Sequence, residues 1–428
     1  MAGVFAKPTH VRYAVLGLVV MVAFITYLDR ALLANAMPSI QKEYGFSIQA
    51  MGLILSCYNW AYAIFQIPSG WFGDRVGPRL ALACVVIWWS VFTLMSGLAT
   101  SMAMLMLCFF LLGMGEAGAF PISNRALSRW MLPGERGFAQ GTAHAGSRLA
   151  SALAPVTVAT LIGLYSWHVP FFVFALVGFV WAGVWFWYYR DVPSEHAGVG
   201  TAERETIVRA LGAGKTRQPI PWKLILSSRR MWVLAAMYFC YNYSLNMFLA
   251  WYPKYLSAAR DYSLAEMGLF SSLTLAAAFI GDICGGVFSD LIIRRTGRVK
   301  FARQSIAITG FLMAAFFIPM GCWAQDRYIV AMMFGLGLFG LELVVGNSWA
   351  VTLDIGGSFA GSCSAVMNTF GNIGGAIMAG ATGFIVHAYG WNPAFYVVSA
   401  LCLLGALLFT RIDAGRKLVP ENAAEPVV

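Results

Sequence analysis

The chain has 428 residues, of which 59% are hydrophobic and only 11% are charged. Soluble domains carry about 25% charged residues, so this composition excludes a water-soluble protein. A bilayer-spanning helix needs about 20 predominantly apolar residues, which leaves room for about twelve spans. The net charge of +10 comes from basic residues in loops beside these spans, not from a nucleic-acid-binding surface. We therefore predict an all-α, polytopic membrane protein whose partners include the lipid bilayer but no nucleic acid.

Apolar stretches separated by short polar breaks predict the positions of the spans. They lie near residues 13–37, 50–70, 79–98, 101–124, 140–164, 168–188, 231–256, 267–293, 303–322, 327–352, 361–387 and 392–411. With the N-terminus in the cytoplasm, 23 of the 29 lysines and arginines fall on the inner side. The positive-inside rule therefore predicts that both termini are cytoplasmic. No signal peptide is expected, because the first apolar stretch runs into charged residues without a small-residue cleavage site.

The longest polar stretch, residues 190–230, divides the predicted spans six and six. We interpret residues 1–189 and 231–428 as an N-terminal and a C-terminal six-helix bundle joined by a cytoplasmic linker. Within this linker, Thr201 is a good helix N-cap and is followed by acidic residues. We nevertheless expect a solvated linker there, with a short surface helix as the alternative.

Two landmarks recur at similar offsets in the two halves. Gly70-x-x-x-Asp74 after the second span matches Gly286-x-x-x-Asp290 after the eighth, 216 residues later. Trp167 before the sixth span matches Trp391 before the twelfth, 224 residues later. Similar offsets at matching span numbers indicate a duplicated six-helix unit, a layout typical of transporters.

The loop after the second span reads Gly70-x-x-x-Asp74-Arg75-x-Gly77-x-Arg79 and resembles the signature of the major facilitator superfamily. Glycine permits close helix approach, an aspartate is favoured near a helix N-terminus, and the arginines can pair with acids. The resemblance implies gating roles, rather than substrate binding, for five residues: Gly70, Asp74, Arg75, Arg79 and Asp290.

Further motifs narrow this resemblance. They are Tyr27-Leu-Asp29-Arg30, Gln66-Ile-Pro68-Ser-Gly70-Trp71, Gly115-Glu116-Ala-Gly-Ala-Phe120-Pro121, Asn124-Arg125 and Gly371-Asn372-Ile-Gly374-Gly375. Together they resemble the anion:cation symporter family, which includes bacterial proton-coupled sugar-acid transporters such as those for galactonate. The resemblance implies a rocker-switch fold in a bacterial inner membrane that carries small organic anions, commonly together with protons. A functional monomer is expected.

Charged groups inside a bilayer are costly and usually serve a function. Arg30 in span 1 offers a planar guanidinium for a substrate carboxylate, and the adjacent Asp29 is a candidate proton carrier. A structural ion pair with another helix is the alternative for both residues. Glu116 has no lysine or arginine within a helical turn, which suits reversible protonation near neutral pH. A neutral glutamic acid bonded to a backbone carbonyl is its alternative.

One departure from the family pattern concerns span 4. Relatives often carry an arginine about two turns before the span-4 glutamate, whereas Leu107–Phe110 is apolar here. Arg148 in span 5 is a possible charge partner, which either replaces the lost cation or pairs with Asp29 or Glu116. His144 lies near the cytoplasmic end of span 5. We expect it to be solvated, with a titrating role as the alternative.

Acidic residues also occur in the second half. Asp282 lies between Gly281 and Gly285 in a small-x-x-x-small pattern that packs helices closely, so an interhelical hydrogen bond and a coupling role both remain open. Glu342 ranks below it as a coupling candidate. Asp354 lies near a span end and is assigned no special role.

Polar residues recur every four positions in three spans: Tyr58, Tyr62 and Gln66; Tyr238, Asn242 and Asn246; Ser364, Asn368 and Asn372. This spacing places each trio on one helix face. An amide that faced lipid would lack partners, so we expect the trios to face a central cavity and to bind hydroxylated substrates. Hydrogen bonds between helices are the alternative. The predicted substrate-binding residues are Arg30, Tyr62, Gln66, Tyr238, Asn242, Asn368 and Asn372.

These observations predict a secondary active transporter that couples protons to the symport of a small organic carboxylate, either a sugar acid or another monocarboxylate. An organic-anion exchanger or efflux protein of the same fold is the alternative. No Walker-type phosphate loop, nucleophile motif or metal-ligand pair is visible, and the eight cysteines never form a C-x-x-C pair. We therefore expect no enzymatic activity, no cofactor and no metal site.

Overall fold

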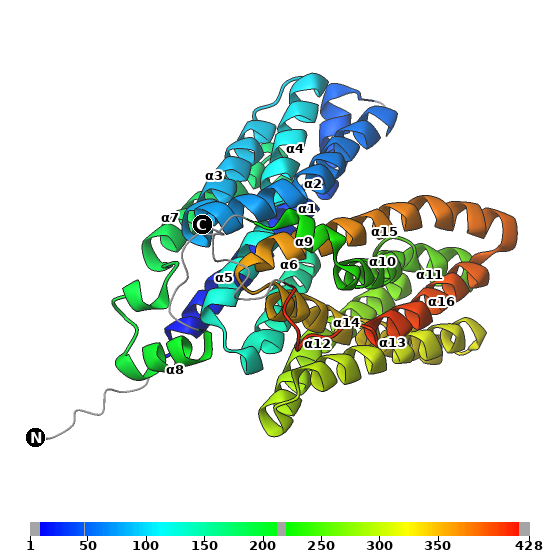
Figure 1. Ribbon diagram of the computed structural model, residues 1–428. Coiled ribbons are helices and arrows are strands. Elements are labelled where there is room, and N and C mark those ends of the chain that lie inside the picture. Colours follow the sequence, from blue (N-terminus) through cyan, green and yellow to red (C-terminus); the bar gives the residue numbers. More distant parts are fainter. Residues whose placement is uncertain (1–8, 47, 212–219, 419–428) are drawn as a thin grey trace, which may run out of the picture. The chain divides into compact units, whose positions relative to one another are not determined.

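The computed structural model describes residues 9–46, 48–211 and 220–418, and their regular secondary structure is helical (Figure 1). The first half contains α1 (Val11–Tyr44), α2 (Ile48–Val76), α3 (Pro78–Gly97), α4 (Met102–Glu116), α5 (Ala119–Trp130), α6 (Arg136–Leu164) and α7 (His168–Tyr188). The linker contains α8 (Thr201–Leu211) and α9 (Trp222–Ser227). The second half contains α10 (Arg229–Ala250), α11 (Tyr252–Arg260), α12 (Leu264–Thr296), α13 (Val299–Trp323), α14 (Arg327–Gly356), α15 (Ala360–Tyr389) and α16 (Trp391–Phe409).

Each predicted span corresponds to one long helix or to a broken pair. The span predicted at 101–124 is divided into α4 and α5, because α4 ends at Glu116. Pro121 has no N–H to donate to the carbonyl group of Ala117, four residues earlier. That carbonyl oxygen instead accepts a hydrogen bond from Gln66 Nε2 at 3.5 Å. The break therefore follows from the Glu116-to-Pro121 motif itself.

Nine stretches of the described helices are long and apolar enough to cross a membrane, and one of them, Arg327–Tyr389, runs over both α14 and α15. Among the described helices of 18 or more residues, only α2 and α10 lie outside these stretches. Both carry polar trios, which lower their hydropathy. The polar residues that make these two helices candidates for substrate binding therefore also make them harder to recognise as membrane spans from hydropathy.

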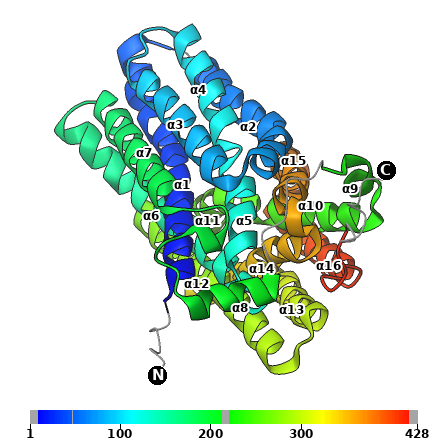
Figure 2. The ribbon, with the colours of Figure 1, turned by 60° about the vertical axis from the view of Figure 1, so that its left-hand side comes forward.

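The described helices form two compact units. The first comprises residues up to Pro133, Gly146–Ile220 and Ser358–Ala365; the second comprises Gly134–Ala145, Pro221–Gly357 and the chain from Val366. In the first unit α2 packs against α4, and α3 packs against α4 and α7 (Figure 2). In the second unit α14 packs against α12 and α13, and α16 packs against α10 and α13. The start of α6 thus belongs to a unit made mainly of the second half, and the start of α15 to one made mainly of the first.

The small-residue pattern around Asp282 packs α12 tightly against α14. A Cβ atom added at Gly281 would lie 2.5 Å from the carbonyl oxygen of Phe339, and one added at Gly285 would lie 2.5 Å from that of Leu343. Side chains at these two positions would push the helices apart. The expected close packing is confirmed.

The expectation of a solvated linker is wrong for part of this segment, because residues Thr201–Leu211 form α8. Glu203 of α8 is 4% exposed and reaches the start of α1. Its carboxylate accepts hydrogen bonds from the backbone N–H groups of Val11 and Arg12 at 3.1 and 3.2 Å, and from the Thr9 hydroxyl at 2.7 Å. His10, the N-cap residue of α1, provides no side-chain hydrogen bond. Glu203 therefore caps α1 from the linker.

Candidate functional site

A buried carboxylate with two donors lies in the first unit. Glu116, at the C-terminal end of α4, is completely buried. Its Oε2 atom lies 3.5 Å from Arg30 Nε of α1 and accepts a hydrogen bond from the Tyr58 hydroxyl of α2 at 2.5 Å. Three helices thus converge on one carboxylate, and the partner that Glu116 lacks on its own helix comes from α1.

The Arg30 guanidinium also lies against two aromatic rings. Its central carbon lies 4.3 Å from the ring centroid of Tyr62 and 4.9 Å from that of Tyr27. Such cation–π contacts help to orient the planar guanidinium. Its Nη2 atom makes no hydrogen bond to the described residues, and the side chain is 26% exposed. Arg30 is therefore fixed in position and retains a donor for an anion.

Asp29 is adjacent to Arg30 in sequence but is not part of its ion pair. Asp29 is 1% exposed, and its Oδ1 atom makes no hydrogen bond to the described residues. Neighbouring side chains on a helix point about 100° apart, which explains why Arg30 pairs with Glu116 rather than with Asp29. A buried carboxyl group with an unused acceptor is costly to keep charged, which fits a proton-binding group.

Gln66 occupies a different environment from Tyr62, one turn before it on α2. Its side chain is completely buried, and it donates to the carbonyl oxygen of Ala117 at the break between α4 and α5. This contact is the hydrogen bond between helices that the sequence left as the alternative for the trio. Phe109, in the apolar stretch where relatives often carry an arginine, is also completely buried.

The second unit contains a chain of aromatic and polar contacts around α10. Trp349 Nε1 of α14 donates to the Tyr238 hydroxyl at 2.7 Å, and the Tyr238 ring stacks on Tyr241 with centroids 5.2 Å apart. The Tyr241 hydroxyl donates to Glu342 at 2.8 Å, and Glu342 is completely buried. The sequence analysis did not predict the contact between Tyr241 and Glu342. The offset of 226 residues between Glu116 and Glu342, which is close to the offset between the two repeats, could have indicated that Glu342 occupies the position equivalent to Glu116.

His144 also belongs to this environment. Its ring centroid lies 5.2 Å from that of Trp349, and the residue is 6% exposed. The expectation of a solvated histidine is therefore wrong. The start of α6, which the sequence places near a helix end, is covered because it packs within the second unit.

The asparagines of the polar trios lie at contacts between α10 and α15. Both asparagines of α10 lie directly against glycines of α15. A Cβ atom added at Gly371 would lie 2.5 Å from Asn242 Nδ2, and one added at Gly375 would lie 2.7 Å from Asn246 Nδ2. Asn246 Nδ2 also donates to the Asn242 carbonyl oxygen at 2.8 Å. Asn368 of α15 is 7% exposed, whereas Asn372 is less buried and its Nδ2 atom makes no hydrogen bond to the described residues.

The duplicated loop motif places two aspartates at the starts of two helices. In the first unit, Asp74 Oδ2 accepts a hydrogen bond from the backbone N–H of Ser362, in the first turn of α15, at 2.7 Å. A Cβ atom at Gly70 would lie 2.7 Å from the carbonyl oxygen of Gly361, so glycine is required for this approach. In the second unit, Asp290 accepts from the backbone N–H groups of Gly137 and Phe138, in the first turn of α6, at 3.2 and 2.6 Å. Each contact joins segments from both halves of the sequence.

The second of these contacts is reinforced by buried ion pairs that the sequence did not reveal. Arg303 of α13 is completely buried and contacts Asp290 at 2.8 Å and Asp354 at 3.3 Å. Asp354 also contacts Arg136 of α6 at 2.7 Å. The interpretation that Asp354 has no special role is therefore wrong. The burial of Asp354 could not be predicted from its position near the end of a span, because it depends on the packing of α13, α14 and α6.

Within the part of the chain that the structure describes, Arg75 and Arg79 form no ion pair with an acid, contrary to expectation. Arg125 of α5, not Arg75 or Arg79, forms the ion pair with Asp74, at 3.3 Å. The Arg75 guanidinium lies over the Trp71 ring at 5.1 Å, and Arg79 Nε donates to the carbonyl oxygen of Phe186 at 3.0 Å. The expected pairing is wrong because α5 packs directly against α2 and brings Arg125 to Asp74.

The sequence profile of the Major Facilitator Superfamily matches residues 19–379. The chain belongs to this superfamily. It is 34% identical over 399 residues to a protein described as a probable sulfoacetate transporter of Cupriavidus necator, covering 92% of each chain. It is 31% identical over 421 residues to a D-galactonate transporter of Escherichia coli, covering 94% of this chain and 96% of the other. These relatives identify the anion:cation symporter type, and the protein is a transporter of organic anions rather than an enzyme.

Solved structures show the same fold. The chain aligns with the proton:xylose symporter XylE at a TM-score of 0.73 and 12% identity, covering 97% of this chain and 99% of the other. It aligns with the human organic anion transporter MFSD10 at a TM-score of 0.71 and 15% identity, covering 93% and 99%. The predicted all-α architecture of twelve membrane helices in two six-helix repeats is therefore confirmed.

Proposed function

We propose that this transporter couples protons to the symport of a small organic carboxylate by alternating access across a bacterial inner membrane, with both termini in the cytoplasm. The observation that carries the proposal is the Arg30–Glu116 contact, which lies within membrane helices and includes a hydroxyl donor from Tyr58. The positive-inside rule supports the orientation. Arg30 is assigned to the substrate carboxylate, and Glu116 and Asp29 are assigned to the proton.

Coupling follows from competition for one guanidinium. When Glu116 is ionised, it holds Arg30 and places a negative charge where the substrate carboxylate would bind. When Glu116 is protonated, the attraction is lost and Arg30 is released to a substrate anion. Proton and substrate therefore favour each other's binding, and this coupling is reciprocal. Tyr58 stabilises the ionised form through its hydrogen bond and thereby sets the pH range of the exchange.

The remaining assignments belong to the same proposal. Tyr62 orients Arg30 through its ring, and Tyr238, Asn242, Asn368 and Asn372 are assigned to polar parts of the substrate. Gln66 is assigned to the same group but acts at the helix break, where it bonds to Ala117. The predicted bundles, residues 1–189 and 231–428, move as the alternating bodies, and the protein works as a monomer.

The aspartates of the duplicated loops are proposed to close the cytoplasmic end. Asp74 holds the start of α15, and Asp290 holds the start of α6, through backbone N–H groups that carry the positive end of each helix dipole. Opening that end requires both contacts to break. Each aspartate also has an arginine partner, Arg125 for Asp74 and Arg303 for Asp290.

The substrate class is proposed from Arg30 together with the relatives. The names of the relatives include sulfoacetate, D-galactonate, and galactarate or D-glucarate. These anions share a carboxylate but differ in their second group, which is a sulfonate, a row of hydroxyls or a second carboxylate. A planar guanidinium suits the shared carboxylate. Transport measurements with each of these acids, and with hexuronates, would identify the substrate.

Purified protein in proteoliposomes with an imposed pH gradient, acidic outside, tests the proposal. Wild-type protein should accumulate the substrate, whereas Glu116→Gln should exchange it across equilibrated membranes without accumulating it. Glu342→Gln is the matched control, because Glu342 is also completely buried and also accepts a tyrosine hydroxyl. Accumulation of substrate by Glu116→Gln would indicate that Asp29, and not Glu116, binds the coupled proton. Exchange without gradient-driven uptake by the wild type would identify an exchanger instead.

A further inference from the structure

A cavity of about 360 Å³ lies where the linker enters the second repeat. It is lined by the end of α9, the start of α10 and the C-terminal segment: Leu224, Ser227, Ser228, Arg229, Arg230, Lys417 and Leu418. Three of these seven residues are cationic, two carry hydroxyl groups and none is acidic. The lining is therefore complementary to an anion that accepts several hydrogen bonds.

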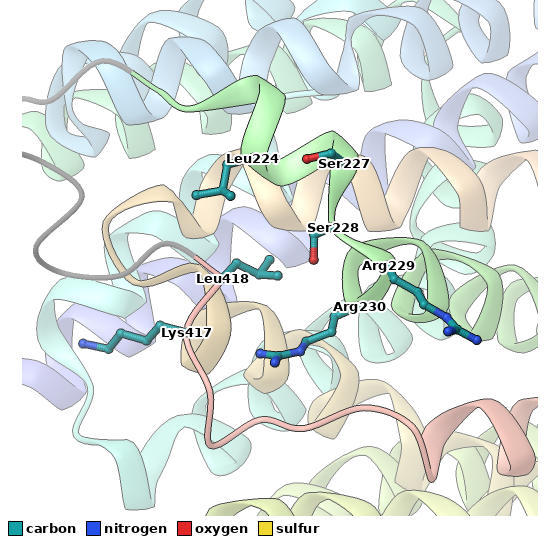
Figure 3. A pocket seen from close by; sticks show the side chains of 7 residues that line it. All are labelled: Leu224, Ser227, Ser228, Arg229, Arg230, Lys417 and Leu418. Atoms are coloured by element: carbon teal, nitrogen blue, oxygen red, sulfur yellow. The ribbon is translucent and has the colours of Figure 1, made fainter.

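The C-terminal segment is fixed against the fold at this place. The backbone N–H of Leu418 donates to the carbonyl oxygen of Ile355, at the end of α14, at 2.9 Å. Leu418 is 8% exposed. In Figure 3 the Ser228 hydroxyl and the Arg230 side chain point into the space between the start of α10 and this segment, while Arg229 and Lys417 extend to either side. Of the three cations, Arg230 thus points into the cavity, while Arg229 and Lys417 lie at its edges and come from two separate parts of the chain.

Apolar side chains beside the cavity are exposed. Leu224 and Leu226 of α9 are 39% and 42% exposed, and Trp232 in the first turn of α10 is 43% exposed. Trp232 Nε1 donates to the carbonyl oxygen of Leu226 at 2.6 Å, which joins the two helices. Tryptophan at the end of a membrane helix is typical of the bilayer interface. The cavity therefore lies beside a surface that fits lipid acyl chains.

We propose that this cavity binds the phosphate headgroup of an anionic membrane phospholipid. Arg230 and the Ser228 hydroxyl would hold the phosphate, Arg229 and Lys417 would add positive charge at the edges of the cavity, and the exposed leucines would contact the upper part of the acyl chains. A soluble phosphate would satisfy the cations but would leave the apolar surface uncovered. Arg30, which is assigned to the carboxylate of the transported anion, lies on α1 and does not line this cavity.

Native mass spectrometry of the purified full chain tests this proposal, with phosphatidylglycerol as the anionic probe and phosphatidylcholine as the zwitterionic one. Wild-type protein should retain phosphatidylglycerol in preference to phosphatidylcholine. The triple variant R229Q/R230Q/K417Q should bind phosphatidylglycerol at least about tenfold more weakly, because each cation near an anionic headgroup contributes substantially. The matched control R204Q/R209Q/K223Q removes three exposed linker cations that do not line the cavity. It should bind like the wild type.

The proposal fails if the triple variant binds phosphatidylglycerol as tightly as the wild type does. It also fails if phosphatidylcholine binds equally well, or if millimolar inorganic phosphate displaces the lipid, since the latter would identify a soluble anion as the ligand. Circular dichroism and thermal unfolding establish that each variant is folded. Should the triple variant not fold, Arg230→Gln and Arg230→Lys provide the comparison. The glutamine variant alone should then lose the preference for the anionic lipid.

Discussion

Tyr58 and Arg30 share one acceptor, the Oε2 atom of Glu116, at 2.5 and 3.5 Å. The neutral donor is therefore the closer of the two. The hydroxyl can stay on this oxygen when Arg30 leaves, while Oε1 makes no hydrogen bond to the described residues. In the proposed mechanism this ion pair is transient, because protonation of Glu116 removes its attraction for Arg30.

Arg30→Lys should lose substrate binding while the protein remains folded. Lysine keeps the charge but cannot form a planar pair of hydrogen bonds to a carboxylate, so we expect affinity to fall about tenfold or more. Isothermal titration with the acid identified by the transport panel measures this change. Arg327→Lys is the control, since Arg327 is 49% exposed and pairs with Glu266 at the protein surface. Wild-type affinity in Arg30→Lys would contradict the assignment.

Tyr58→Phe should move the pH dependence of transport to higher pH. In the wild type, the hydrogen bond from Tyr58 favours the ionised carboxylate of Glu116. Without this bond, Glu116 stays protonated at higher pH and Arg30 stays available to the substrate. A hydrogen bond to a charged group contributes about 1.5–3 kcal/mol, which corresponds to a displacement of about one to two pH units. Counterflow measured at several pH values detects it. Tyr241→Phe, which removes the corresponding donor to Glu342, should not change the pH dependence of transport.

Monocarboxylates should inhibit transport more strongly than matched dicarboxylates. The Glu116 cluster supplies one guanidinium, and a second buried anion without a partner costs several kcal/mol. If Arg148 also binds substrate, this preference should be weak in the wild type and should strengthen in Arg148→Gln. Competition assays in both proteins separate the cases. Strong dicarboxylate inhibition that survives the Arg148 change would refute recognition by a single guanidinium.

Asp354→Asn should loosen the start of α6. The substitution weakens the contacts of Asp354 with Arg136 and with the completely buried Arg303. Loss of a partner for a buried cation costs about 3 kcal/mol, so the melting temperature should fall. Hydrogen exchange of the backbone N–H groups from Gly137 onward should become faster. Asp413→Asn removes a more exposed partner of Lys300 and should have little effect on either measurement.

The sequence was sufficient to find the charged residues of the site but not their partners. Asp29, Arg30 and Glu116 were found because charges in apolar stretches are costly wherever the helices pack. The Arg30–Glu116 contact joins residues 86 positions apart, and only the packing of the helices brings them together. Arg303 and Asp354 gave no such signal, because near the ends of spans the same residues would be solvated in most folds. Burial at a helix end is a property of tertiary structure.

The periodic trios show a second limit. Spacing predicted a shared helix face for Tyr58, Tyr62 and Gln66, yet the three side chains have different partners: a carboxylate, a guanidinium and a backbone carbonyl group. The partner of Gln66 depends on Pro121, which frees the carbonyl of Ala117 on another helix. A pattern within one helix cannot contain that information. The fold, by contrast, follows from hydropathy and from the repeated loop, which do not depend on such details.

The cap that Glu203 places on α1 has a consequence for dividing the protein into two polypeptides. The carboxylate comes from a position 192 residues beyond Val11, so the first half depends on a piece of the chain that follows its last membrane helix. A first fragment that ends after Leu211 keeps this cap, whereas one that ends at Tyr189 lacks it. Co-expressed halves should therefore reassemble into a working transporter when the first includes α8, and poorly when the shorter fragment is used.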